Sequence, residues 1–277
     1  MTGADVVRLG ESDLDALLEA VYQRYAYDFR QYARASMRRR VTSALAVFGV
    51  PSVVDLQATV LNDPQAFARL LSILTVPVSE FFRDPPYFRA VLHHVLPTLA
   101  TYPTPRVWVA GCSTGEEVYS LAILLDEHGL LGRTLIYATD INPQSLRTAR
   151  AGVYALDRMA AFTRQYHAAG GTGELSAYYT AAYAGAVFDR RLAERVVFTD
   201  HCLATDAAFA EVQFVSCRNV LIYFTRALQQ RAVGLFRESL VRRGFLGLGS
   251  RESLGFTEHA DAFEVVDPAA RLYRSLT

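Results

Sequence analysis

The spacing of apolar residues changes at Arg106, and this change constrains the fold more than any other feature of the sequence. Before it, residues from about Ser12 to Leu74 carry apolar side chains at helical spacing. After it, short and partly β-branched apolar runs alternate with helical stretches, as in VWVAG at 107–111 and TLIYATD at 134–140. Strands that alternate with helices indicate a parallel α/β sheet. The sequence therefore predicts an all-helical segment followed by an α/β domain.

Four further apolar runs are expected to be strands, and one stretch of the chain fits neither pattern. The runs are VVFTD, EVQFVSC, FLGLGS and RLYRSL, which begin at residues 196, 211, 245 and 271. Between Asp157 and Ala193 the alternation of strands and helices fails. Residues 167–188 are rich in Gly, Ala and Tyr and show no clear helical stripe, which favours an insertion or small subdomain. We therefore expect two domains, residues 1–75 and 76–277, with an insertion at about 157–193 in the second.

Charge and composition argue against several classes of function. The 277 residues include 28 basic and 28 acidic side chains, so no global field attracts nucleic acid or a membrane surface. The N-terminus lacks the pattern of a signal peptide, and the longest uncharged runs are shorter than the roughly 18 residues that suggest a membrane span. The cysteines, Cys112, Cys202 and Cys217, suit neither a disulfide framework nor a zinc site. We expect a soluble cytoplasmic protein with no metal, no nucleic-acid partner and no membrane insertion.

Polar residues gather at the expected carboxyl ends of the strands, where open α/β sheets bind ligands. Gly111 to Gly115 form a tight turn before a helix that begins near Glu116, and Asp140 lies 25 residues beyond Gly115, at the end of the next strand. This spacing is typical of a nucleoside site, in which an acidic residue accepts hydrogen bonds from ribose hydroxyls. The alternative is that Asp140 only caps the helix that follows, a role that Asn142 could fill equally well.

Two glutamates directly after the glycine turn narrow the choice of ligand. Glu116 and Glu117 would repel the pyrophosphate of a dinucleotide, and the turn lacks the full Gly-x-Gly-x-x-Gly pattern. A nucleoside that carries no phosphate and has cationic groups avoids both objections. S-adenosylmethionine has that chemistry, with a sulfonium and an α-ammonium group. The alternative for the glutamates is compensation of the helix dipole in the first turn.

Four segments of the chain resemble signature segments of the CheR-type chemotaxis receptor methyltransferases. They are FFRDPPYF, VWVAGCSTGEEVYSLA, ATDIN and FVSCRNVLIYF, and the resemblance runs in the same order from about Leu14 to the C-terminus. It implies a Rossmann-like domain that binds S-adenosylmethionine and contains a small inserted β-subdomain, preceded by an all-helical domain. It also implies a cytoplasmic enzyme that methylates glutamate side chains on the cytoplasmic helices of chemoreceptors, with S-adenosylhomocysteine as the product.

The resemblance carries functional roles to single positions of this sequence. It implies that Arg83 and Tyr223 lie at the methyl-transfer centre. The positions that it implies for cofactor contact are Ser79, Arg83, Gly111, Glu117, Asp140, Cys202, Leu203, Arg218 and Asn219. A structural interpretation stays open for two of them, because Arg83 could form a surface ion pair with Asp84 and Tyr223 could be a core aromatic residue.

A basic stretch marks the second predicted helix, at roughly residues 30–48. Arg34 and Arg38 lie one turn apart, and Arg39 and Arg40 are adjacent to them. The resemblance implies that this face docks on the acidic methylation region of receptor helices, to which it would be attracted. A solvated face is the alternative, and a short basic stretch in a neutral protein supports nucleic-acid binding only weakly.

Departures from the family pattern keep rival functions open. Pro77 and Cys202 stand where relatives have asparagine, and residues 249–254 read GSRESL where the family has GHSESL. The leading hypothesis is a protein-glutamate O-methyltransferase. The rivals are a methyltransferase of this fold with another acceptor, and a regulator or scaffold of receptor signalling that binds S-adenosylmethionine with weak or no turnover.

Overall fold

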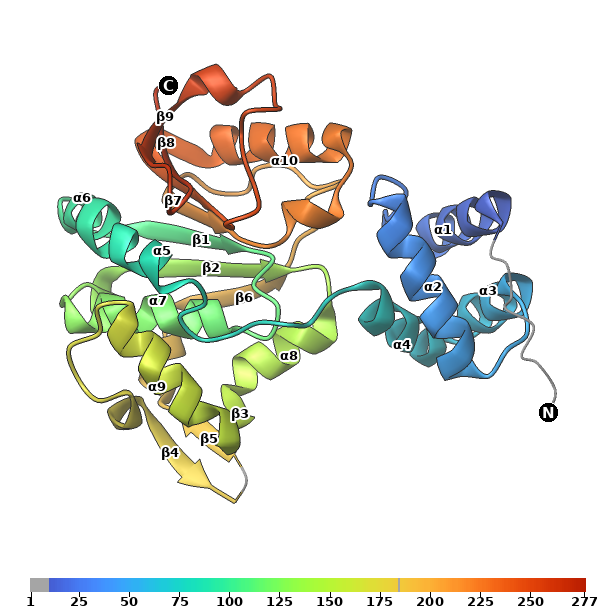
Figure 1. Ribbon diagram of the computed structural model, residues 1–277, viewed down its shortest axis with the longest axis horizontal. Helices are drawn as coiled ribbons and strands as arrows, with labels where there is room; N and C mark the ends of the chain where they lie inside the picture. Colours follow the sequence, from blue (N-terminus) through green and yellow to red (C-terminus); the bar gives the residue numbers. More distant parts are fainter. Residues whose placement is uncertain (1–9, 184) are drawn as a thin grey trace. The chain divides into compact units, whose positions relative to one another are not determined.

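The structure is a computed structural model that describes residues 10–183 and 185–277 (Figure 1). Packing divides the chain into two units. The first, called here the helical unit, comprises the chain up to Val76 together with Tyr223–Leu228. The second, called the sheet unit, comprises Pro77–Ile222 and Gln229–Thr277.

The described part of the helical unit contains four helices before Val76. They are α1 (Glu11–Tyr25), α2 (Arg34–Phe48), α3 (Val53–Asn62) and α4 (Pro64–Leu74). Each buries an apolar face, as helical spacing predicts, and the fully buried side chains include Leu14, Val41, Leu56 and Leu70. No single helix among the described residues has the length and apolar composition to cross a membrane; α2 and α3 meet that test only together, across a bend of 74°.

Helix α2 begins at Arg34, four residues later than the sequence pattern predicts. Arg30 is held before the helix by Asp28, which accepts hydrogen bonds from its backbone N–H at 3.0 Å and from Nη2 at 2.8 Å. Tyr32 then forms an antiparallel bridge with Phe224, so the residues before α2 pair with a distant segment of the chain instead of extending the helix.

A seven-stranded sheet forms the centre of the sheet unit, with the strand order β6-β2-β1-β7-β8-β10-β9. Its strands are β1 (Arg106–Ala110), β2 (Leu135–Asp140), β6 (Val196–Asp200), β7 (Val212–Cys217), β8 (Leu240–Leu248), β9 (Phe263–Asp267) and β10 (Leu272–Ser275). Neighbouring strands from β6 to β8 pair in parallel, and β10 is antiparallel to β8 and β9. All six predicted runs contain strands; β9 is an additional one. The Rossmann-like fold is thus confirmed.

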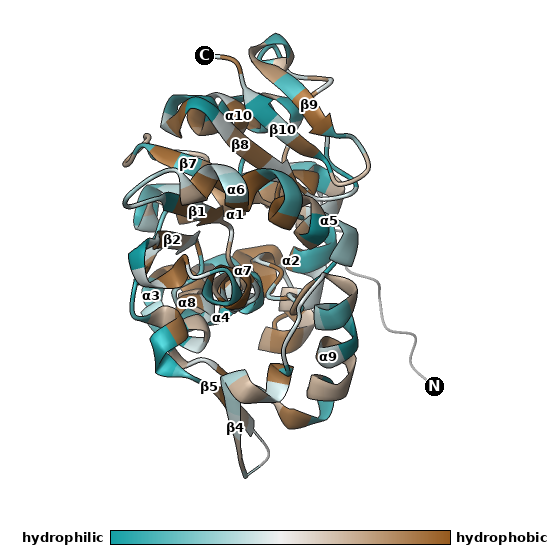
Figure 2. Cartoon of the chain, turned by 90° about the vertical axis from the view of Figure 1, so that its left-hand side faces the viewer, coloured by the Kyte–Doolittle hydropathy of each residue, from teal (hydrophilic) through white to brown (hydrophobic). Residues whose placement is uncertain are grey.

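Helices cover the sheet because its central strands are buried on both faces. They are α5 (Pro85–Ala90), π-helical Val91–Val95, α6 (Leu96–Ala100), α7 (Glu116–Glu127), α8 (Pro143–Ala151) and α10 (Arg226–Ser239); α9 (Met159–Ala168) contacts α5 and belongs to the insertion. Along β1, Val107 and Val109 belong to the core that includes α7. Trp108 packs edge-on against Phe236 of α10, with 5.4 Å between the ring centres. Figure 2 shows the hydrophobic residues along β1, β7 and β8.

A small antiparallel sheet and α9 occupy the region of the predicted insertion (Figure 1). The strands are β3 (Val153–Ala155), β4 (Tyr179–Ala182) and β5 (Gly185–Phe188), in the order β3-β5-β4. Helix α9 buries Met159, Phe162 and Tyr166 on one face and lies almost entirely before residues 167–188, the stretch expected to lack a helical stripe.

Candidate active site

The chain order of the large sheet reverses between β1 and β7. From β1 the chain continues to β2 and β6 on one side, and it later returns to β7 and β8 on the other. Ligands of open α/β sheets bind at such a point, outside the carboxyl ends of the strands. The glycine turn follows β1, Asp140 ends β2, and Arg218 and Asn219 follow β7. The fold therefore brings these predicted site residues to one edge of the sheet.

The glycine turn after β1 is fixed by neighbouring segments. The N–H groups of Gly111 and Cys112 both donate to the Thr139 carbonyl at 2.8 Å. Gly111 has φ +73°, and a Cβ atom on it would lie 2.4 Å from Val220 Cγ2. Gly115 has φ +95° and would place a Cβ atom 2.8 Å from that of Ala149. Both glycines are required by backbone conformation and by close packing, whatever else binds there.

Asp140 connects the turn to the end of β2. Its Oδ2 accepts from the N–H of Ser113 and its Oδ1 from the N–H of Asn142, both at 2.8 Å. The cap of α8 is Asn142, whose Oδ1 accepts from Gln144 N at 2.9 Å and Ser145 N at 3.4 Å. The alternative that Asp140 caps this helix is therefore wrong. Burial raises the pKa of Asp140 while the backbone N–H groups oppose that shift, and both oxygens retain acceptor capacity.

Ser113 is a site candidate that sequence reasoning missed. It has φ +52°, in the left-handed region that few non-glycine residues adopt. Its Oγ is buried and has no hydrogen-bond partner among the described residues. A buried hydroxyl without a partner, next to the carboxylate of Asp140, is a group that a bound ligand would satisfy. The signal in the sequence is a serine between two glycines, in a turn whose pattern is defined by the glycines alone.

Glu117 is oriented by hydrogen bonds to both of its carboxylate oxygens. Ser216 Oγ donates to Oε1 at 2.6 Å, and Arg218 Nη1 donates to Oε2 at 3.1 Å. Because Ser216 gives its only hydrogen to Glu117, the 2.5 Å contact between its Oγ and the Tyr87 hydroxyl is donated by Tyr87. Burial first, and then the charge of Glu117, raise the pKa of Tyr87, which keeps this donor protonated. The Glu117 side chain is 15% exposed, so a ligand can still reach it.

Arg218 is held by protein groups at both Nη atoms, whereas its buried Nε has no hydrogen-bond partner among the described residues. Its side chain is 1% exposed. Nη1 binds Glu117, and Nη2 donates to Asp84 Oδ2 and to the Arg83 carbonyl, each at 2.8 Å. The guanidinium also lies 4.1 Å from the centre of the Tyr87 ring. Arg218 thus connects Glu117 to the loop at residues 82–84, and the structure gives it a supporting place beside Glu117.

Arg83 lies in a strained loop of the sheet unit. Its neighbours Phe82 and Asp84 have φ values of +51° and +58°, which cost about 1–3 kcal/mol each and occur mainly at functional sites. The loop is anchored where Phe82 N donates to Ser120 Oγ at 2.9 Å. No hydrogen bond or ion pair within the described ranges holds the Arg83 guanidinium. The alternative of an Arg83–Asp84 pair is therefore wrong, since Asp84 binds Arg218.

Asn219 adopts the left-handed conformation directly after Arg218, with φ +59°. Its backbone N–H donates to Glu252 Oε2 at 3.0 Å. In the described part of the chain no residue forms a hydrogen bond with its side-chain amide. Asn219 therefore has both an amide donor and an amide acceptor left for a ligand.

The other predicted residues have local contacts in their own units. The Ser79 carbonyl accepts from Arg158 Nη2 at 3.4 Å. After β6, Cys202 N donates to Asp206 Oδ2 at 2.8 Å, and Leu203 is buried. Tyr223 is half-buried and belongs to the helical unit, where its carbonyl accepts from Ala33 N at 2.7 Å and the Arg40 guanidinium lies 5.7 Å from its ring centre.

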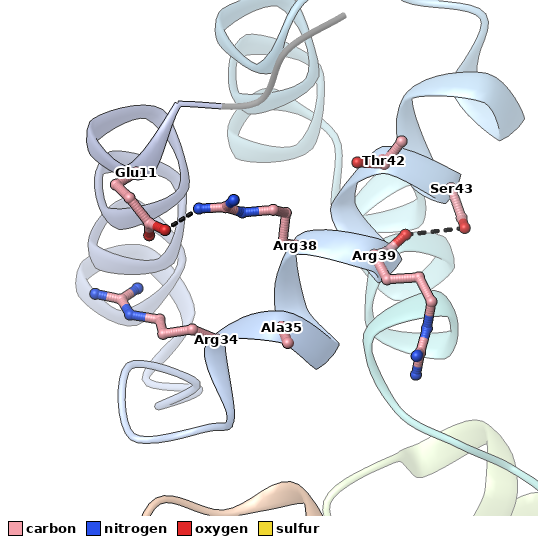
Figure 3. A pocket seen from close by; sticks show the side chains of 7 residues that line it. All are labelled: Glu11, Arg34, Ala35, Arg38, Arg39, Thr42 and Ser43. Atoms are coloured by element: carbon pink, nitrogen blue, oxygen red, sulfur yellow. Dashed lines mark hydrogen bonds and ion pairs between the residues drawn. The ribbon is translucent and has the colours of Figure 1, made fainter. Parts of the chain in front are cut away.

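The basic face of α2 borders a hollow of about 580 Å³ in the helical unit (Figure 3). The hollow is lined by Glu11, Arg34, Ala35, Arg38, Arg39, Thr42 and Ser43. Arg34 forms an ion pair with Asp15 and Arg38 with Glu11, whereas the Arg39 side chain extends away from Glu11 and has no ion pair among the described residues.

Arg40 differs from the other three arginines because its guanidinium is used inside the helical unit. Its Nη1 donates to the carbonyls of Ile73 and Thr75, each at 3.1 Å, so it joins α2 to the end of α4. Burial accordingly lowers the pKa of Arg40. Nothing in residues 10–183 and 185–277 groups three or more His, Cys, Asp or Glu side chains in a way that could hold a metal ion.

Comparison with known proteins identifies both units. Residues 77–271 match the family model described as CheR methyltransferase, SAM binding domain, and residues 12–75 match CheR methyltransferase, all-alpha domain. The Cher3 protein of Pseudomonas putida is 54% identical over 95% of this chain and 96% of its own length. A chemotaxis protein methyltransferase of Listeria monocytogenes is 30% identical over 88% of this chain and 91% of its own.

Two further comparisons concern a longer protein and a solved structure. An uncharacterized 104.1 kDa protein of Rhodobacter capsulatus is 32% identical over 90% of this chain, which spans 26% of that protein's length. Among solved structures, the N-methyltransferase NodS of Bradyrhizobium japonicum has a TM-score of 0.41 at 10% identity, over 72% of this chain and 90% of its own. The two family models together span most of the sequence. The chain belongs to the CheR methyltransferase family, and its cofactor is S-adenosylmethionine.

Proposed function

We propose that this methyltransferase transfers the methyl group of S-adenosylmethionine to glutamate side chains on the cytoplasmic helices of chemoreceptors, and that it works in the cytoplasm. The observation that carries the proposal is that Glu117 and Asp140 lie at one edge of the sheet while the Arg83 guanidinium has no hydrogen bond or ion pair among the described residues. Relatives named chemotaxis protein methyltransferase, from Listeria monocytogenes and Klebsiella aerogenes, support the choice of pathway. Residues 76–277 would carry the chemistry and residues 1–75 would dock the receptor.

The donor set fits the cofactor. Glu117 is an oriented carboxylate suited to a cationic group, and Asp140 has acceptor capacity for ribose hydroxyls. Ser113 Oγ and the Asn219 amide are polar groups without protein partners in the described residues. When bound, S-adenosylmethionine supplies a methyl group already activated by its sulfonium. We assign cofactor contact to these four residues, and we assign Arg218 to the support of Glu117.

The proposed acceptor asks little acid–base chemistry of the protein. A glutamate side chain has an unperturbed pKa of about 4.3, so it is already a nucleophilic carboxylate at neutral pH and needs no general base. What remains is to hold that carboxylate in place and in the right direction. We propose that the free guanidinium of Arg83 does this by charge-assisted hydrogen bonds, and that the Tyr223 hydroxyl contributes a further donor.

We propose Arg34, Arg38 and Arg39 as the receptor-docking surface. Receptor methylation sites are acidic in this proposal, and a basic face attracts them. Two of the three guanidiniums are already paired with carboxylates of α1. Arg39 is the charge that is not compensated in this way, so it should contribute most to attraction. We exclude Arg40 from the docking surface, because its guanidinium donates hydrogen bonds to the carbonyls at the end of α4.

Reversing the charge of Arg39 is expected to slow receptor methylation without affecting the cofactor. In the Arg39→Glu variant, kcat/KM for a receptor cytoplasmic fragment should fall about tenfold, which corresponds to about 1.4 kcal/mol of lost attraction. The difference from wild type should shrink as salt is added. Arg24→Glu, an exposed charge reversal on α1, is the matched control. Equal rates for the Arg39 and Arg24 variants would count against the docking surface.

The proposed reaction is tested by the chemical stability of the product. The protein is incubated with methyl-labelled S-adenosylmethionine and a chemoreceptor cytoplasmic fragment, and the labelled fragment is then treated with mild alkali. Glutamate methyl esters release labelled methanol under these conditions, whereas N-methyl groups do not. Alkali-stable label would reject the glutamate assignment. An unlabelled receptor, despite tight binding of S-adenosylhomocysteine, would indicate a regulator.

A further inference from the structure

Glu252 is a buried carboxylate that no role described so far uses. It lies in the segment after β8, and its residue is 4% exposed. No ion pair in the described ranges compensates its charge. Burying an isolated carboxylate is unfavourable unless other groups stabilise it. Backbone N–H groups do so here, and the loops to which they belong show what Glu252 holds together.

The carboxylate accepts hydrogen bonds from two loops at the edge of the sheet. Gly249 N donates to Oε2 at 2.6 Å, and Asn219 N donates to the same oxygen at 3.0 Å. Ile222 N donates to Oε1 at 3.3 Å. Glu252 therefore fastens the loop that follows β7 to the turn that follows β8.

The two loops can approach closely because Gly249 has no side chain. A Cβ atom on Gly249 would lie 2.7 Å from Glu252 Oε2, 2.8 Å from Asn219 N and 2.9 Å from Asn219 Nδ2. The carboxylate and the Asn219 amide thus pack against the same backbone atom. Asn219 also has φ +59°, a left-handed conformation that asparagine tolerates better than most non-glycine residues but that is still less favourable than its right-handed and extended conformations, so neighbouring contacts help to hold it.

We propose that Glu252 is a positioning residue for cofactor binding, which acts by holding Asn219 in its left-handed conformation. The inference rests on the proposed cofactor contact of Asn219. A glutamine at position 252 would keep the size of the side chain but replace one acceptor oxygen with an NH₂ group that faces N–H donors. An aspartate would keep the charge but lose a methylene of reach between the two loops. Either change should make the conformation of Asn219 less fixed, without removing a group that contacts the ligand.

The test is a double-mutant cycle on S-adenosylhomocysteine binding, measured by calorimetry with the full chain. Glu252→Gln and Asn219→Ala are each expected to weaken binding about tenfold, the order expected when one positioning hydrogen bond is lost. The double variant should bind S-adenosylhomocysteine as tightly as the single variant with the lower affinity, because both changes remove the same contact. Glu258→Gln, an exposed carboxylate six residues later, is the matched control and should bind like wild type.

Two outcomes would overturn the proposal. They are unchanged affinity in the Glu252 variant, with or without a fall in the thermal midpoint, and additive losses of affinity in the double variant. If the glutamine variant does not fold, Glu252→Asp replaces it in the same cycle, with the same expectations. Wild-type protein that binds S-adenosylhomocysteine but methylates no receptor would reject the proposed substrate and leave this inference standing.

Discussion

Glu117→Gln is expected to weaken S-adenosylhomocysteine binding about 10- to 100-fold and to reduce methyl transfer at least as much. Hydrogen bonds to charged groups are worth about 1.5–3 kcal/mol, and each 1.4 kcal/mol is tenfold in affinity. Both oxygens of Glu117 are already oriented, by Ser216 and Arg218, so the carboxylate meets a cationic ligand without further ordering. The amide keeps the shape of the side chain but removes the charge.

The measurement is calorimetric affinity, together with methylation of a receptor fragment at saturating and at limiting cofactor. Glu238→Gln, an exposed carboxylate on α10, is the matched control and should leave both unchanged. If affinity falls but saturating cofactor restores the wild-type methylation rate, Glu117 acts in binding alone. Wild-type affinity in the Glu117 variant would reject the role proposed for it.

The elements that the sequence predicts best are those whose signal is local. Alternation of apolar runs predicted six strands of the large sheet, and the glycine pattern predicted the turn between β1 and α7, because each depends on neighbouring residues. Asp63 and Pro64 likewise mark the start of α4 by short-range capping chemistry. In contrast, α2 begins late because Tyr32 pairs with Phe224, a contact between residues far apart in the sequence.

The support of the site could not be predicted for the same reason. Arg218, Asp84 and Glu117 come from three separate segments, and only folding brings them together. Glu252 depends on N–H groups of a loop about 30 residues earlier, and such donors leave no trace in the identity of the side chains. Sequence motifs gave the residues proposed to contact a ligand, whereas the residues that hold them in place are visible only in the structure.

Arg218→Met is expected to cause a large loss of stability in the sheet unit. It would leave Glu117 largely buried without its cationic partner and release Asp84 and the Arg83 carbonyl. Removing one partner of a buried ion pair costs about 3–5 kcal/mol. For a unit of this size, a loss of that order lowers the thermal midpoint by about 10 °C. Differential scanning calorimetry measures the shift, and Arg237→Met, an exposed arginine on α10, is the control.

A second variant separates stability from binding. In the double variant Arg218→Met with Glu117→Gln, the buried charge and its partner are both absent, so most of the lost thermal stability should return. Affinity for S-adenosylhomocysteine should not return, because the carboxylate that attracts the cationic ligand is gone. Recovery of both would mean that Glu117 serves the fold alone, and recovery of neither would mean that Arg218 stabilises mainly the loop at residues 82–84. The expected split follows from the two roles proposed for Glu117, an ion pair with the buried Arg218 that stabilises the fold and attraction of a cationic ligand.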